Sequence, residues 1–183
     1  RRLGAVGDHE ARHLRFDRIE KGWIHKTTPN GDPDNRDDWQ RGIPHNGIVD
    51  HEAMDGNLLD PPAAFSAPNC WGNDLGLGGT TDRNVGPSSW NWLESPSIDC
   101  RGRFGIHLRL GRWLTLERYD RARILVNGSL VWESPFDRDT LDTSWRAVDL
   151  DIAAVADDRP AVKVRFEMTT NAENEAGGWT IDN

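Results

Sequence analysis

The sequence is poor in cysteine, and this limits how the chain can be cross-linked. Only Cys70 and Cys100 occur among its 183 residues. Two cysteines are too few for a disulfide-stabilised scaffold, and the four-cysteine spacing of a structural zinc site is absent. One disulfide or two buried free thiols are both compatible with the sequence, because spacing alone does not show that the two Cβ atoms meet.

Long apolar runs are also missing. No stretch approaches the roughly 18 residues that a membrane-spanning helix needs, so we expect no membrane insertion. No signal-peptide pattern is visible either. Because the chain begins at Arg1 rather than Met, we expect a processed or partial chain, and the missing signal does not argue against export.

A basic excess is lacking as well. The net charge is −8 and the pI is about 5.2, which argues against a nucleic-acid binder with a basic face and is compatible with cations as partners. The hydrophobic fraction of 36% and the mean hydropathy of −0.71 are low for a packed domain. The nine tryptophans are therefore expected to supply much of the core.

Helical periodicity is scarce, whereas alternation of apolar and polar residues is plentiful. Residues 104–116, 145–152 and 162–168 alternate with the period of two that is typical of half-buried strands. Asn127-Gly128 stands between two apolar runs and predicts a hairpin turn, because both residues tolerate positive φ.

The first hundred residues are richer in loops. We expect strands at residues 16–25, with a bend at Gly22, and at 67–74 and 90–98, and a long acidic loop region around 27–60. Residues 1–14 are expected to form a flexible arm, and 15–183 one domain. The predicted fold class is all-β, a two-sheet antiparallel β-sandwich of short strands.

Eight short phrases occur in an order that resembles a known family. They are Phe16-Asp17, Gly22-Trp23, and residues 38–44, 70–75, 93–99, 113–117, 119–124 and 178–182. Together they resemble the MAM-like jelly-roll modules of secreted bacterial proteins, such as those appended to immune inhibitor A-type metallopeptidases. The resemblance covers about residues 15–183 and implies a sandwich without catalytic machinery, joined to catalytic or adhesive domains.

The resemblance also implies a structural cation that ties the first strand to the last. It makes Asp17 and Asp182 ligands, on strands that would lie side by side, and Asn183 stands where the family has a second acid. Oxygen ligands favour Ca²⁺ over Zn²⁺. The alternative is that both aspartates are solvated acids at strand ends.

Two further acidic stretches, at residues 32–38 and 117–120, offer carboxylates to a cation. Asp32, Asp34 and Asp38 belong to a crowded acidic loop that lacks the glycine and glutamate of an EF-hand, so it is either an irregular calcium loop or a solvated turn. Glu117 and Asp120 can add cation ligands or form surface ion pairs with Arg118 or Arg121, and we favour ion pairs.

The segment His9-Glu10-Ala11-Arg12-His13 matches the zinc-peptidase pattern of two histidines flanking a glutamate. Its polar surroundings and the absence of the metzincin continuation favour a flexible arm instead. Glu94 and Asp99 are conceivable as a glycosidase acid/base pair, but only carboxyl separation and pKa values decide that.

Trp113 shares the polar face of its strand with His107 and Arg109, which suits sugar stacking and nominates these three as ligand-binding residues. The alternative is that long loops cover Trp113. Trp90 and Trp92 share one strand face and are assigned to the core.

The sequence therefore predicts a secreted or cell-surface, non-catalytic module with structural calcium. Its expected role is adhesion, binding of glycans or other extracellular polymers, or targeting of appended domains. The rival hypotheses are a zinc peptidase that uses His9, Glu10 and His13, and a self-assembling structural domain without a ligand.

Overall fold

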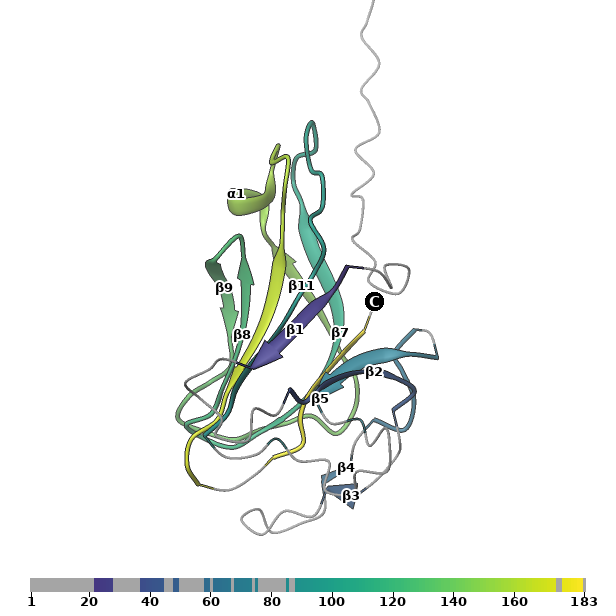
Figure 1. Cartoon of the computed structure of the whole chain (residues 1–183), viewed down its shortest axis with the longest axis vertical. Helices are drawn as coiled ribbons and strands as arrows, with labels where there is room; N and C mark the ends of the chain where they lie inside the picture. Colours follow the sequence, from purple (N-terminus) through teal and green to yellow (C-terminus); the bar gives the residue numbers. More distant parts are fainter. Residues whose placement is uncertain are drawn as a thin grey trace, which may run out of the picture.

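The computed structural model forms two antiparallel sheets that pack face to face (Figure 1). It describes residues 22–27, 37–44, 48–49, 58–59, 61–66, 68–73, 75, 85, 88–173 and 176–182. His9, Glu10, His13 and the predicted arm at 1–14 lie outside these residues. The predicted all-β sandwich is confirmed.

The first sheet has five strands in the order β1-β6-β12-β8-β9. Their bounds are Ile24–Thr27 for β1, Trp90–Glu94 for β6, Val164–Thr169 for β12, Arg121–Val126 for β8 and Ser129–Glu133 for β9. The β8–β9 hairpin turns at Asn127 and Gly128, whose φ angles of 50° and 79° are both positive. The predicted Asn-Gly turn is confirmed.

The second sheet has six strands. Five follow the order β10-β7-β13-β5-β2, and the sixth, β11, pairs with residues 107–112 of β7, whereas β10 pairs with residues 115–116. The bounds are Thr140–Leu141 for β10, His107–Leu116 for β7, Gly178–Asp182 for β13, Cys70–Asn73 for β5, Trp39–Gly42 for β2 and Arg146–Asp151 for β11. Helix α1 (Ala153–Ala156) follows β11, and β3 (Ile48–Val49) pairs with β4 (Leu58–Leu59).

The core lies between the two sheets and is aromatic at its centre. Trp179 of β13 is 0% exposed, and its ring centroid lies 5.5 Å from Phe166 of β12 and 5.7 Å from Trp132 of β9. Aromatic pairs at such spacings add attraction beyond the burial of their area. The expectation that tryptophans supply the core is confirmed for Trp39 and Trp179.

The surroundings of the last strand and the state of the two cysteines bear on two expectations. β13 is hydrogen-bonded to β7 and β5, whereas β1 pairs with β6 in the other sheet. The last strand is expected beside the strand of Phe16 and Asp17, which lie outside the described residues, so that expectation stays a prediction. Cys70 and Cys100 are free and buried, so the thiol alternative describes the structure.

Candidate functional site

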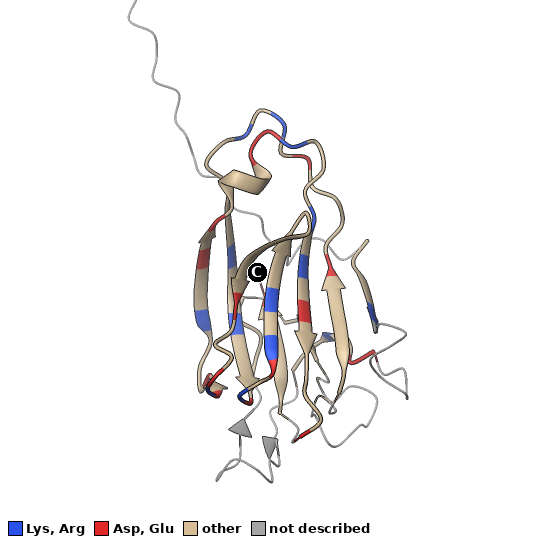
Figure 2. Cartoon of the chain, turned by 90° about the vertical axis from the view of Figure 1, so that its left-hand side faces the viewer, with Lys and Arg blue, Asp and Glu red and all other residues tan. Residues whose placement is uncertain are grey.

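The outer face of the five-stranded sheet is lined by polar and aromatic side chains, and we call it the open face. Leu93, Ile124 and Phe166 point into the core, so the residues alternating with them point outward. The outward set is Trp90, Trp92 and Glu94 on β6, Arg165 and Glu167 on β12, Arg121 and Arg123 on β8, and Glu133 on β9. Figure 2 shows basic and acidic segments side by side on these strands.

Trp90 and Trp92 lie on the open face, so their assignment to the core is wrong. Trp90 is 40% exposed, and Trp92 is half-buried. The guanidinium carbon of Arg165 lies 4.3 Å from the centroid of a Trp92 ring, a cation–π distance. Two tryptophans spaced by two residues on one strand thus present aromatic surface toward the outside of the sandwich.

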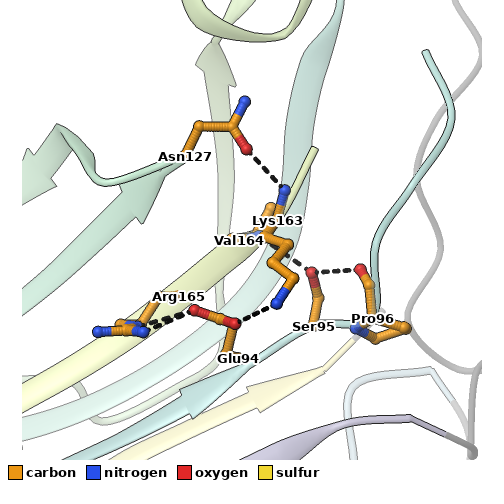
Figure 3. A network of polar contacts seen from close by, with 7 residues as sticks. All are labelled: Glu94, Ser95, Pro96, Asn127, Lys163, Val164 and Arg165. Carbon is orange, nitrogen blue, oxygen red and sulfur yellow. Dashed lines mark hydrogen bonds and ion pairs between the residues drawn. The ribbon is translucent and has the colours of Figure 1, made fainter. Parts of the chain in front are cut away.

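Beside Trp92, Glu94 binds two cationic side chains (Figure 3). Its Oε1 accepts a hydrogen bond from Nζ of Lys163 at 2.8 Å, and its Oε2 accepts one from a terminal nitrogen of Arg165 at 2.7 Å. Partial burial alone would raise the pKa of Glu94, but the bonds and charges of Lys163 and Arg165 outweigh it, so this pKa is lowered. Glu94 is therefore held ionised.

A surface hollow opens where this triad meets the β8–β9 hairpin. It has a volume of about 360 Å³ and is lined by Glu94, Leu125, Asn127, Gly128, Lys163 and Arg165. The side-chain oxygen of Asn127 accepts a hydrogen bond from the backbone N–H of Lys163 at 3.0 Å, which holds the hairpin against β12 (Figure 3). The hollow is large enough for a small ligand and offers it hydrogen-bond donors and acceptors.

The rest of the open face is a ladder of ion pairs. Glu133 accepts hydrogen bonds from Arg121 at 2.7 Å and Arg123 at 2.8 Å, and Arg123 also reaches Glu167 at 3.4 Å. The two arginine hydrogen bonds are the main cause of the lowered pKa of Glu133. The face therefore satisfies its charges within itself.

Part of the outer face of the six-stranded sheet, around Gly111 and Asp182, is covered instead, and we call the covering residues 61–66 the roof. Trp145 donates a hydrogen bond from Nε1 to the carbonyl of Ala63 at 2.8 Å, and Ser66 donates one from its backbone N–H to Asp182 at 2.8 Å. Phe65 lies over Gly111, where an added Cβ would meet its ring at 2.6 Å.

The three residues nominated for ligand binding lie on this second sheet. Trp113 is only 6% exposed, with a Trp145 ring 6.1 Å away, so the alternative that loops cover it describes the structure. His107 and Arg109 both contact Asp149, at 2.7 Å each. They thus form a surface ion-pair cluster, with the ring of Trp113 closed to a sugar.

Of the cation ligands implied by the resemblance, the structure describes only Asp182. It is 5% exposed, and its two carboxylate oxygens accept hydrogen bonds from the backbone and hydroxyl of Ser66. Asp17 and Asn183 lie outside the described residues, and their site stays a prediction.

The acidic loop is described only at its end. Asp38 accepts a hydrogen bond from Asn91 at 3.3 Å, and the neighbouring Asp37 contacts His25 at 2.7 Å. Asp32 and Asp34 lie outside the described residues. Within the described ranges, no group of three or more His, Cys, Asp or Glu side chains is placed to hold a metal.

Asp120 is buried, whereas the sequence favours a surface ion pair for it. It is 0% exposed, and its Oδ1 accepts a hydrogen bond from the backbone of Asn171 at 2.8 Å, while Arg121 pairs with Glu133. The predicted surface ion pair is therefore wrong for Asp120. Burial is the largest cause that raises the pKa of Asp120, to about 7, and the nearby charge of Glu117 adds to it.

The carboxyl pair considered for glycoside hydrolysis has the wrong electrostatics. The hydrogen bond from Arg101 is the main cause that lowers the pKa of Asp99 to about 2, and the pKa of Glu94 is lowered too. A general acid needs a raised pKa, so neither carboxyl suits that role.

None of the helices in the described ranges is long and apolar enough to cross a membrane.

No protein-family model and no curated protein matches the sequence. Among solved structures, the chain is similar to the family 11 carbohydrate-binding module of cellulase Lic26A-Cel5E of Clostridium thermocellum. The identity is 10%, the TM-score is 0.47, and 93% of this chain and 91% of that one are covered. It is also similar to the K1 adhesin domain of Lys-gingipain from Porphyromonas gingivalis W83, with 16% identity, a TM-score of 0.39, and coverages of 88% and 98%.

Proposed function

We propose that the chain is a non-catalytic, glycan-binding β-sandwich module and that the open face is its binding surface. The observation that carries this proposal is the pair Trp90 and Trp92 on one outward strand face, next to the hollow lined by Glu94, Lys163 and Arg165. Aromatic surface together with a few fixed polar groups is the composition expected of a small-molecule site.

The chemistry of a sugar fits both parts of this surface. A pyranose ring has an apolar C–H face that stacks on an indole ring, and its hydroxyls donate and accept hydrogen bonds. Glu94 is an acceptor, while Lys163 and Arg165 are donors. Because Lys163 and Arg165 both bind Glu94, the three groups are fixed before the ligand arrives, which lowers the entropy lost on binding.

The wider setting of the module is part of the same proposal. The MAM-like resemblance supports an accessory role in a secreted or cell-surface protein, beside catalytic or adhesive domains. It also supports structural calcium bound by Asp17 and Asp182, for which the buried carboxylate of Asp182 is the described part. A calcium-dependent rise in melting temperature that is lost in Asp17→Ala tests that site.

A glycan array followed by calorimetry on the best ligand tests the binding proposal. We expect Trp90→Ala to weaken binding about tenfold or more, since that corresponds to about 1.4 kcal/mol. Phe104→Ala is the matched control, because Phe104 is a 65% exposed aromatic residue away from the open face. Equal affinities of the two variants, or an array without any bound glycan, would overturn the proposal.

A further inference from the structure

The turn between β7 and β8 buries two carboxylates at one end of the sandwich. Asp120 is 0% exposed and Glu117 is 8% exposed. The backbone N–H of Asp120 donates a hydrogen bond to the carbonyl of Glu117 at 3.2 Å, which closes the turn and brings the two Cα atoms within about 7 Å. Both acidic side chains are buried, and the charge of Glu117 adds to the burial that raises the pKa of Asp120, so the two carboxyl groups lie near each other.

The Asp120 carboxylate is only half satisfied by its surroundings. Its Oδ1 accepts the backbone N–H of Asn171, whereas its buried Oδ2 accepts no hydrogen bond from any described residue. Leaving a buried charged oxygen without a partner costs several kcal/mol in general, so such an atom is normally protonated, paired or bound to a metal.

We propose that the Glu117–Asp120 turn binds a divalent cation of the calcium class, with Oδ2 of Asp120 and the carboxylate of Glu117 as its acidic ligands. Calcium accepts irregular sets of oxygen ligands and fills the remaining positions with backbone carbonyls and water. The site is separate from Asp182, which faces the roof from the middle of the second sheet.

A cation here would link three separate segments. Tyr119, between the two acids, is held by a hydrogen bond from its N–H to the carbonyl of Phe136 at 2.8 Å, and Asp120 is bonded to Asn171. The ion would thus fasten the β7–β8 turn to the segments after β9 and β12.

Thermal melting of the full chain in EDTA and in increasing CaCl₂ at pH 7.5 tests the site. At calcium 100-fold above the dissociation constant, the midpoint of the wild type should rise by roughly 5 to 10 °C. Asp120→Asn and Glu117→Gln should each lose the part of this rise that the turn contributes and keep any part that the Asp182 site contributes. Asp120→Asn should also melt higher than the wild type in EDTA, because it removes a buried charge that lacks a counterion.

Asp182→Asn and Glu133→Gln are the controls, one at the other predicted calcium ligand and one on the open face. Calorimetric titration with CaCl₂ counts the sites directly, and Asp120→Asn should bind one ion fewer than the wild type. A calcium-induced rise that is undiminished in both Asp120→Asn and Glu117→Gln would overturn the proposal. A wild-type midpoint that does not change with calcium would also overturn it.

Discussion

The two outer faces of the sandwich differ in how far their tryptophans are exposed and in what contacts their polar side chains. The open face carries Trp90 and Trp92 beside charged side chains that pair across strands, with no chain segment needed to satisfy them. The opposite face carries the buried Trp113 against Trp145, which binds the roof formed by residues 61–66. A sheet face that satisfies its own polar groups can stay open, whereas the face around Trp113 has been covered.

The difference can be traced to single positions on the strands. Gly111 of β7 leaves the space that the Phe65 ring fills, and Asp182 of β13, paired with it, binds Ser66. On the open face, Arg165 of β12 contacts Glu94 and Trp92 of β6, and Glu167 contacts Arg123 of β8. The side chains of the sheet therefore decide where a ligand can reach it.

The largest expected effect comes from filling the space under the roof. Gly111→Val places a Cβ about 2.6 Å from the Phe65 ring, so the roof has to move. We expect the free energy of unfolding to fall by about 1–3 kcal/mol, as for other overpacked sites. Urea unfolding measures this. In Phe65→Ala the same substitution should cost clearly less, and equal costs in both backgrounds would show that Phe65 is not the obstacle.

A smaller effect is expected from releasing one anchor of the roof. Trp145→Phe removes the N–H that binds the carbonyl of Ala63 while keeping an aromatic ring near Phe65 and Trp113. Loss of a single hydrogen bond should lower the free energy of unfolding by about 0.5–1.5 kcal/mol. Limited proteolysis should also cut the roof faster. Unchanged cleavage and stability would mean that this bond does not hold the roof.

The sequence predicted the strands better than the faces. Alternation identified residues 104–116 and 162–168 as strands, and β7 and β12 lie within or close to those bounds. Periodicity shows which residues share a face, but not which face is covered. For that reason the sequence leaves Trp113 either ligand-binding or covered by loops and wrongly assigns Trp90 and Trp92 to the core. The structure covers Trp113 and places Trp90 and Trp92 on the open face.

The burial of Trp113 depends on contacts between distant parts of the chain. Trp113 is enclosed through Trp145 and the roof, whose Ala63 lies 82 positions from Trp145 in the sequence. No local pattern reports such a contact. The burial of Asp120 was missed for the same reason, since it depends on Asn171, whereas Arg118 and Arg121 are its near neighbours in sequence.

On the open face, the change in the free energy of unfolding with pH should show how much the ion pairs of Glu94 contribute. Its lowered pKa means that the folded state favours the ionised form, so its contribution is complete above the ordinary value of 4.5 and is lost as the pH falls through the folded-state pKa. Glu94→Gln should cost about 0.5–1 kcal/mol at pH 7, discounted because Lys163 and Arg165 are well exposed.

The comparison is made by denaturant unfolding from pH 7 to pH 3. The difference between the wild type and Glu94→Gln should shrink below pH 4.5 and not above it. Asp149→Asn is a matched control outside the open face, because Asp149 is likewise bound by His107 and Arg109 but is well exposed. A difference for Glu94→Gln that is constant with pH would contradict the assigned ion pairs.

The smallest effect is expected from the ladder around Glu133. In Arg121→Gln, Glu133 keeps its contact with Arg123, so little is left unpaired. We expect a loss below about 0.5 kcal/mol that shrinks further in high salt, because exposed pairs are weak and screened. Denaturant unfolding at low and high NaCl measures it. The guanidinium carbon of Arg121 lies 4.0 Å from the centroid of the Phe136 ring. A loss well above 1 kcal/mol, or one insensitive to salt, would mean that Arg121 stabilises the fold mainly through this ring. The open face would then depend on packing, as the roofed face does.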